Sequence, residues 1–282
     1  MIRIVTDSTA NVPTAVVERY GIEVVPLRVI FPDITYRDQV DITAEEFYRL
    51  LPHCETLPTT SQPPASEFED AFRRLSQDGS QVIAILISSK LSGTVASATA
   101  AQRALPDLPV TVFDSWTTSA LQAFMVEHAA EKAAQGATMQ EVVQDLEVLK
   151  ARSQILFTIE TFRYLQKGGR IGNASALAAS VLRIQPILTL NQGVVDVWGK
   201  VRGKRRALQV MMETARERGG TGEGLRVAVV HASAPDVAAE MADDVTRQLQ
   251  CPRPELMQIS PVIGTHVGPG AIGLGYYHRD WL

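Results

Sequence analysis

Hydrophobic residues in the first half of the chain follow two alternating patterns. Short β-branched runs predict strands, and the stretches between them carry apolar residues at helical spacing. The predicted strands cover residues 2–6, 23–30, 81–88 and 110–114. Capping boxes, which pair a hydroxyl with a glutamate three residues later, predict three helix starts, at Thr43 with Glu46, Ser66 with Glu69, and Thr138 with Glu141. This alternation is typical of a mostly parallel sheet with helices on both faces.

The pattern changes near residue 153. Strands are predicted over 155–159, 185–190 and 194–200, and the last two are joined by a short turn that contains Gly193. A helix over 204–216, a strand over 225–231, a helix over 235–250 and two closing strands follow. We therefore expect an α/β protein of two domains: a Rossmann-like domain over 1–152 and an α+β sandwich over 153–282. Whether the segment near 58–80 packs with the second domain stays open.

Composition narrows the class of protein. The chain of 282 residues has 45% hydrophobic and 21% charged residues, which is typical of a globular protein with a sizeable core. Its formal net charge of −4 gives no overall attraction to polyphosphate and argues against a nucleic-acid partner. The N-terminus does not resemble a signal peptide, and no apolar run approaches the length of about 20 residues that spans a bilayer. We expect a cytoplasmic protein without an integral membrane segment.

Cysteine usage indicates neither a metal site nor a disulfide framework. Cys54 and Cys251 are far apart in the sequence, and neither has the spacing of a metal-binding motif. We expect two buried thiols and no cofactor.

Small hydroxyl-bearing residues collect where the predicted strands of the first half end. In an open parallel sheet, ligands bind at the carboxyl ends of the strands. Any one hydroxyl could simply cap the helix that follows it, but four such clusters together predict a polar rim. The segment Ser92-Gly93-Thr94 opens a predicted helix and could offer several donors to one anionic head group.

A glycine-rich segment at residues 264–270 contains His266, which makes this histidine the best candidate for a functional imidazole. We expect a loop there. Residues 268–273 match the dinucleotide fingerprint by letter, but only nine residues follow Gly273, too few for the rest of that unit. Arg170 follows two glycines, and the turn they form could display it to a partner.

The ordered set of motifs resembles the DegV family of bacterial fatty-acid-binding proteins. The match spans nearly the whole chain. It rests on Val5-Thr6-Asp7-Ser8-Thr9, Thr60-Ser61-Gln62-Pro63, Ser89-Lys90-Leu91-Ser92-Gly93-Thr94, Tyr164-Leu165-Gln166-Lys167-Gly168-Gly169-Arg170-Ile171, Lys200-Val201-Arg202 and Gly264-Thr265-His266-Val267-Gly268-Pro269-Gly270.

The resemblance implies a buried tunnel for one long-chain fatty acid, such as palmitate or another C16–C18 acid. It implies that the hydroxyls of Thr60 and Ser92 bind the carboxylate, and that Ser61, Gly93, Thr94, Thr265 and His266 complete the head-group site. It further implies a non-catalytic subunit that presents the acid to a separate ATP-dependent fatty-acid kinase. Arg170, and less strongly Arg202, would then lie on the docking surface for that kinase.

Burial of an acyl chain makes this role physically reasonable. Fifteen carbons at ~0.8 kcal/mol each give about 12 kcal/mol before ordering and desolvation costs, so neutral hydroxyls would suffice at the carboxylate.

Two alternative functions stay open. One is a serine-type lipid esterase that uses Ser92, Asp114 and His266, although the chain has no Gly-x-Ser-x-Gly elbow. The other is a protein-interaction or regulatory module in which the ligand only stabilises the fold and Arg170 serves the partner.

Overall fold

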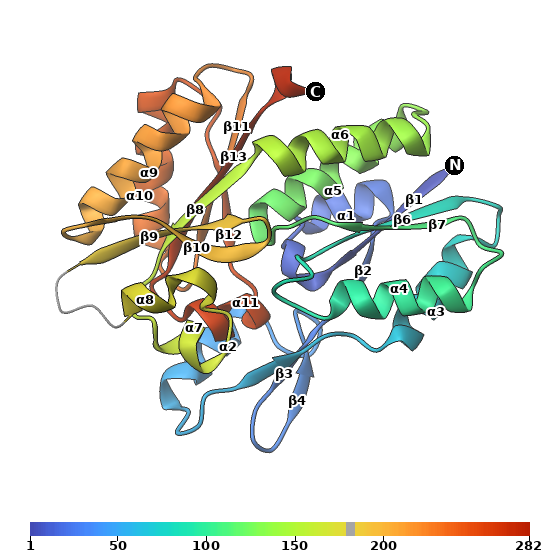
Figure 1. The fold of residues 1–282 in the computed structure, drawn as a ribbon, viewed down its shortest axis with the longest axis horizontal. Coiled ribbons are helices and arrows are strands. Elements are labelled where there is room, and N and C mark those ends of the chain that lie inside the picture. Colours follow the sequence, from blue (N-terminus) through green and yellow to red (C-terminus); the bar gives the residue numbers. More distant parts are fainter. Residues whose placement is uncertain (179–183) are drawn as a thin grey trace.

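The computed structural model describes residues 1–178 and 184–282, and its elements form three sheets (Figure 1). The first is a four-stranded parallel sheet in the order β2-β1-β6-β7. Its strands are β1 (Ile2–Asp7), β2 (Glu23–Val25), β6 (Gln81–Leu86) and β7 (Val110–Asp114). The predicted parallel sheet is therefore confirmed.

Helices cover both faces of this sheet, as the alternating pattern predicts. One face carries α3 (Ala65–Leu75) and α4 (Thr94–Ala104), which share a core with the strands. The other face carries α5 (Ser119–Ala134), which packs against α1 (Thr14–Tyr20) and α6 (Met139–Arg152).

Two of the three predicted capping boxes are present. Thr43 and Glu46 bond reciprocally at the start of α2 (Ala44–Leu50), and Thr138 and Glu141 do so at the start of α6. The box predicted at Ser66 and Glu69 is wrong, because α3 begins at Ala65 after Pro64 and has no side-chain cap. Proline already fixes φ and lacks the N–H donor at that position, so the chain enters the helix without a hydroxyl cap.

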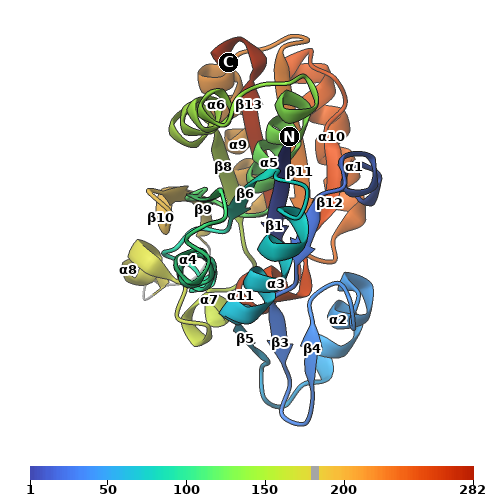
Figure 2. The same ribbon diagram turned by 90° about the vertical axis from the view of Figure 1, so that its right-hand side faces the viewer.

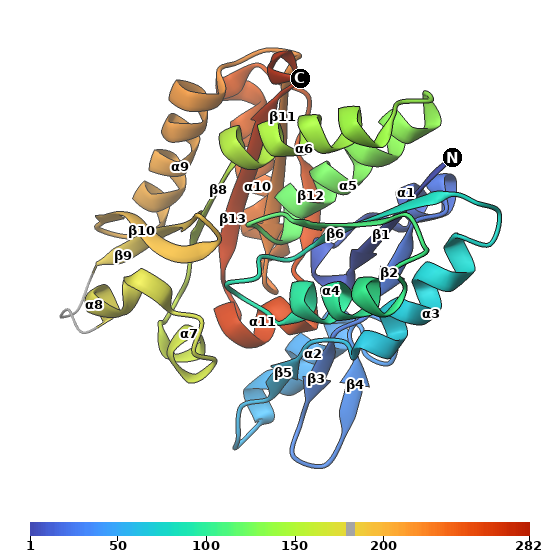
Figure 3. The ribbon, with the colours of Figure 1, turned by 45° about the vertical axis from the view of Figure 1, so that its right-hand side comes forward.

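A small antiparallel sheet in the order β4-β3-β5 was not predicted. It consists of β3 (Arg28–Ile30), β4 (Thr35–Arg37) and β5 (Thr59–Ser61). The strand predicted over 23–30 is broken at Pro26, which cannot donate to a ladder, so β2 and β3 belong to different sheets. Figures 2 and 3 show this small sheet and α2 projecting away from the two larger sheets.

The third sheet has six strands in the order β10-β9-β8-β13-β11-β12. Its strands are β8 (Gln154–Thr158), β9 (Gln185–Asn191), β10 (Val194–Val201), β11 (Leu225–His231), β12 (Glu255–Gln258) and β13 (Ile272–His278). Only β11 and β12 pair in parallel, and the turn after Asn191 joins β9 and β10 as an antiparallel hairpin, as predicted.

The six-stranded sheet is covered on both faces. The helices α9 (Lys204–Gly219) and α10 (Pro235–Leu249) share one core with it. Its other face contacts α5, which also contacts β1 and β6, so α5 lies between the two large sheets (Figures 1 and 3). The strands of the two sheets fall on either side of Arg152, where α6 ends, and the domain boundary there remains a prediction.

The remaining elements are short. They are α7 (Arg163–Lys167), α8 (Ser175–Ala178), α11 (Pro261–Val267) and the short 3-10 helices at Ser8–Ala10, Leu51–His53, Gly172–Ala174 and Arg279–Trp281. The loop predicted over 264–270 is wrong in its first half, because α11 continues through Val267 and ends at Gly268. In the described residues, no helix is both long and apolar enough to cross a membrane.

Candidate functional site

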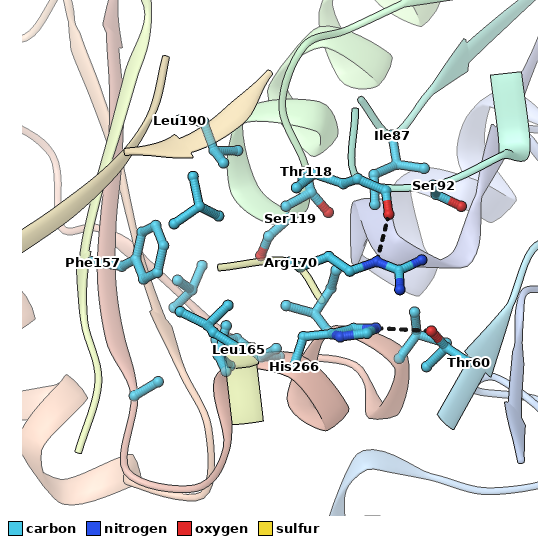
Figure 4. A pocket seen from close by; sticks show the side chains of 18 of the residues that line it. Thr60, Ile87, Ser92, Thr118, Ser119, Phe157, Leu165, Arg170, Leu190 and His266 are labelled. Carbon is cyan, nitrogen blue, oxygen red and sulfur yellow. Dashed lines mark hydrogen bonds between the residues drawn. The ribbon is translucent and has the colours of Figure 1, made fainter. Parts of the chain in front are cut away.

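A cavity lies between the two large sheets, with walls from both halves of the chain (Figure 4). The cavity is narrow, with a volume of about 90 Å³. Most of its wall is apolar. The apolar lining residues are Leu27, Ile87, Leu91, Ile155, Phe157, Leu165, Leu190, Val195, Val230, Ile259, Val262, Ile263, Val267, Ala271 and Ile272.

Polar side chains meet at one end of this cavity. Figure 4 shows Thr60, Ser92, Arg170 and His266 on one side, whereas Phe157 and Leu190 lie opposite. Thr60 comes from β5, Ser92 from the loop before α4, and His266 from α11. With Arg170, which follows the helix Arg163–Lys167, four segments that are distant in sequence form one polar end.

His266 is held in a neutral, buried position. Its Nε2 atom lies 2.8 Å from Oγ1 of Thr60, and its Nδ1 atom is buried without a hydrogen-bond partner. Burial, and then the positive charge of Arg170, lower the pKa of His266 to about 4. The ring is uncharged at neutral pH and serves as a hydrogen-bonding group.

Arg170 forms part of the cavity wall. Its Nε donates to the carbonyl of Leu91 at 3.0 Å and its Nη1 to the carbonyl of Gly168 at 2.6 Å. Both acceptors are neutral, so the guanidinium brings a positive charge to the polar end. A guanidinium is well suited to pair with a carboxylate there. Arg170 is half-buried, so its place on a docking surface stays a prediction beside its position in the cavity wall.

The residues predicted for the site divide into those that line the cavity and those that do not. Thr60, Ser61, Ser92 and His266 line the cavity. Gly93 packs against Gln62, and Thr94 bonds to Ser92, so both support the wall from behind. The Thr265 hydroxyl donates to the carbonyl of Pro261 within α11, and Arg202 is exposed outside the lining.

The hydrogen bonds do not assemble a serine-hydrolase relay. Ser92 Oγ pairs with Oγ1 of Thr94 at 2.8 Å. Asp114 accepts from the backbone N–H groups of Ser89 and Trp116, and His266 pairs with Thr60. Within residues 1–178 and 184–282, no bond joins any two of Ser92, Asp114 and His266, so the arrangement that activates a serine is not formed.

Three further polar lining residues were not among the site residues predicted from the sequence: Gln62, Thr118 and Ser119. Thr118 and Ser119 follow β7 by a few residues, so the rule that ligands bind at strand carboxyl ends could have found them. In the described part of the chain, no cluster of three or more His, Cys, Asp or Glu residues could hold a metal ion.

A mostly apolar cavity with one charged, hydroxyl-bearing end is typical of a binding site for an amphipathic small molecule. The family model described as "Uncharacterised protein, DegV family" matches residues 1–279. The chain belongs to the DegV family.

Relatives and solved structures cover nearly the whole chain. Protein DegV of Bacillus subtilis is 34% identical over 276 residues, which are 97% of this chain and 98% of that protein. A Thermus thermophilus DegV family structure, described as showing fatty acid binding, is 32% identical with a TM-score of 0.93 and covers 98% of this chain and 99% of its own. A stearic acid-binding protein of Eubacterium ventriosum is 27% identical with a TM-score of 0.90 and covers 99% of both chains.

Proposed function

We propose that this protein binds one long-chain fatty acid in the cavity, with the carboxylate at the polar end. The observation that carries the proposal is the meeting of Arg170, His266, Thr60 and Ser92 at one end of a cavity whose other walls are mostly apolar. The fatty-acid binding described for two of the similar structures supports it.

The chemistry of the two ends fits the two parts of the ligand. Burial of the acyl chain supplies most of the binding free energy, about 0.8 kcal/mol for each methylene. A carboxylate that leaves water needs a partner, because an unpaired charge in an apolar site is costly. Arg170 supplies the charge, and Thr60 and Ser92 supply hydroxyl donors. The neutral His266 ring adds a hydrogen bond without adding a second charge.

We further propose that the protein presents the bound acid to a separate ATP-dependent kinase subunit that forms an acyl phosphate. The protein itself would then be non-catalytic, which is consistent with the unformed relay at Ser92. Since such a kinase uses ATP, this role would take place in the cytoplasm. Arg170 and, less strongly, the exposed Arg202 are the candidates from the sequence for the kinase surface.

The first experiment is mass spectrometry of the purified protein, first native and then after denaturation and organic extraction. We expect one fatty acid per chain, with a length of about 16–18 carbons, which would be long enough to supply the chain-burial energy above. A protein that carries no acid, and that takes up no palmitate after delipidation, would contradict the proposal.

The kinase step needs a separate test. The loaded protein, ATP and a candidate kinase subunit should yield an acyl phosphate, detected as its hydroxamate. Replacement of Arg202 by Gln should weaken this reaction without changing palmitate affinity. Loss of palmitate binding in that variant would place Arg202 in the lipid site instead.

A further inference from the structure

A second polar point lies in the wall of the same cavity, apart from the head-group end. Ser119, the first residue of α5, is 2% exposed and lines the cavity, and its Oγ has no hydrogen-bond partner. Figure 4 shows Ser119 on the Phe157 side of Arg170, with its hydroxyl directed into the cavity. A buried hydroxyl without a partner is costly, so its presence in a ligand cavity requires an explanation.

The start of α5 adds donors at the same place. This helix has 16 residues, and its N-cap Thr118 accepts no hydrogen bond from the first turn. Within the described residues, the N–H groups of Ser119 and Ala120 have no acceptor. The N-terminus of a helix of this length attracts an oxygen atom through those N–H groups and the helix dipole.

The backbone holds Ser119 in an unusual conformation. Its φ is +55°, in the left-handed region that residues with a Cβ avoid. Strain of this kind is often retained where a side chain must be placed for a ligand. Here the strained residue is also the one whose hydroxyl is unpaired.

The side chains around Ser119 indicate which kind of ligand oxygen could bind there. A carboxylate would bind more favourably at the end of the cavity where Arg170 supplies a positive charge. Around Ser119 the lining is formed by the neutral Thr118, whose hydroxyl donates to the carbonyl of Thr9, and by apolar side chains such as Phe157, and these surroundings favour a neutral group. An unsubstituted acyl chain would place methylenes against the Ser119 hydroxyl and leave it unpaired.

We propose that Ser119 and the N-terminus of α5 form a second binding point for a neutral oxygen substituent on the acyl chain. The ligand class is then a hydroxylated fatty acid whose hydroxyl lies at one particular distance from the carboxylate. This inference rests on the proposed fatty-acid binding, and it adds a preference for position along the chain.

The test compares delipidated wild-type protein with variants in competition binding. The probes are palmitic acid and a set of hydroxypalmitic acids with the hydroxyl at successive positions. Wild-type protein should bind one positional isomer about two- to tenfold more tightly than its neighbours, the effect of one neutral hydrogen bond. The variant Ser119→Ala should lose this positional preference and bind palmitic acid at least as tightly as wild type.

Two further variants keep the result interpretable. Ser119→Gly also removes the hydroxyl, and glycine accepts a positive φ, so this variant should fold at least as well as wild type. Ser76→Ala removes a buried, unpaired hydroxyl outside the cavity and should leave the positional preference unchanged.

The outcomes separate this inference from the proposed function. If palmitic acid binds but all hydroxypalmitic isomers are equally weak, or if the preference survives in both Ser119 variants, the second binding point is wrong and fatty-acid binding stands. If neither palmitic acid nor any isomer binds, both proposals fail.

Discussion

The Nε2 atom of His266 on α11 lies 2.8 Å from the Oγ1 atom of Thr60 on β5, although 206 positions separate the two residues in the chain. The bond joins the small sheet to the C-terminal half at the polar end of the cavity. Because the pKa of His266 is lowered to about 4, this pair remains neutral over the physiological pH range. The fixed charge at this end of the cavity comes from Arg170.

Removal of the Thr60 and Ser92 hydroxyls should weaken fatty-acid binding. Thr60→Val and Ser92→Ala each remove a hydrogen bond to a charged group, worth about 1.5–3 kcal/mol, so the Kd for palmitate should rise at least tenfold in each variant. Isothermal titration calorimetry with delipidated protein measures this. Thr265→Val is the control, because its hydroxyl donates within α11. Unchanged affinity in the Thr60 and Ser92 double variant would place the carboxylate elsewhere.

Replacement of Arg170 should affect lipid binding more than replacement of Arg202. Arg170→Gln removes the positive charge at the polar end of the cavity, and the palmitate Kd should rise by about tenfold to a hundredfold. Arg202→Gln changes an exposed residue outside the lining and should leave that Kd unchanged. Equal affinity in wild type and Arg170→Gln would return Arg170 to a role in partner docking alone.

The sequence pattern predicted both large sheets, because their strands and helices are long enough to show their periods. The small sheet was missed because each of its strands has only three residues, too few for an alternation to be recognised. Only Pro26 indicates the break between β2 and β3 in the sequence, because residues 23–30 otherwise form one hydrophobic run.

The candidate site shows a similar limit. Motifs identified Thr60, Ser92 and His266, but a motif does not give the direction of a long side chain, and Arg170 turns inward to the carbonyl of Leu91. Gly264 was interpreted as part of a loop. It lies within α11, where a Cβ would come 2.5 Å from the hydroxyl of Tyr48, so close packing explains this glycine.

Gly168 should be required for the position of His266. A Cβ at residue 168 would lie 2.1 Å from Nδ1 of His266, so Gly168→Ala must displace the ring from Thr60. We expect weaker palmitate binding and a loss of about 1–3 kcal/mol in the free energy of unfolding, as for other overpacked sites. Gly199→Ala is the control, because its Cβ would meet nothing within 4 Å. Matching affinities for the two variants would mean that the ring position is unimportant for binding.

Asp38 should make stability depend on pH through the helix that carries His266. Its carboxylate is fully buried, accepts from the Ser8 hydroxyl at 2.6 Å, and lies 3.4 Å from the backbone N of Val262 in the first turn of α11. Burial raises the pKa of Asp38 to about 7, whereas an unfolded aspartate titrates near 4. Between these values the folded state holds the extra proton, so this residue makes the protein less stable as pH rises.

The variant Asp38→Asn tests this sign. Asparagine stays neutral, so the free energy of unfolding of the variant relative to wild type should increase from pH 4 to pH 7 by roughly a few kcal/mol, at about 1.4 kcal/mol per pKa unit. Burial of His266 acts in the opposite sense, because its lowered pKa makes stability rise with pH between about 4 and 6.5. The slope that remains in the variant combines His266 and His231, whose lowered pKa values make stability rise with pH, with Asp7, whose raised pKa acts in the opposite sense. Urea unfolding across this range measures both curves.

Asp41→Asn is the control. Arg37 lowers the pKa of the exposed Asp41 carboxyl to about 2, so the curve of this variant should run parallel to wild type above pH 4. A constant difference between Asp38→Asn and wild type would mean that Asp38 is already ionised throughout.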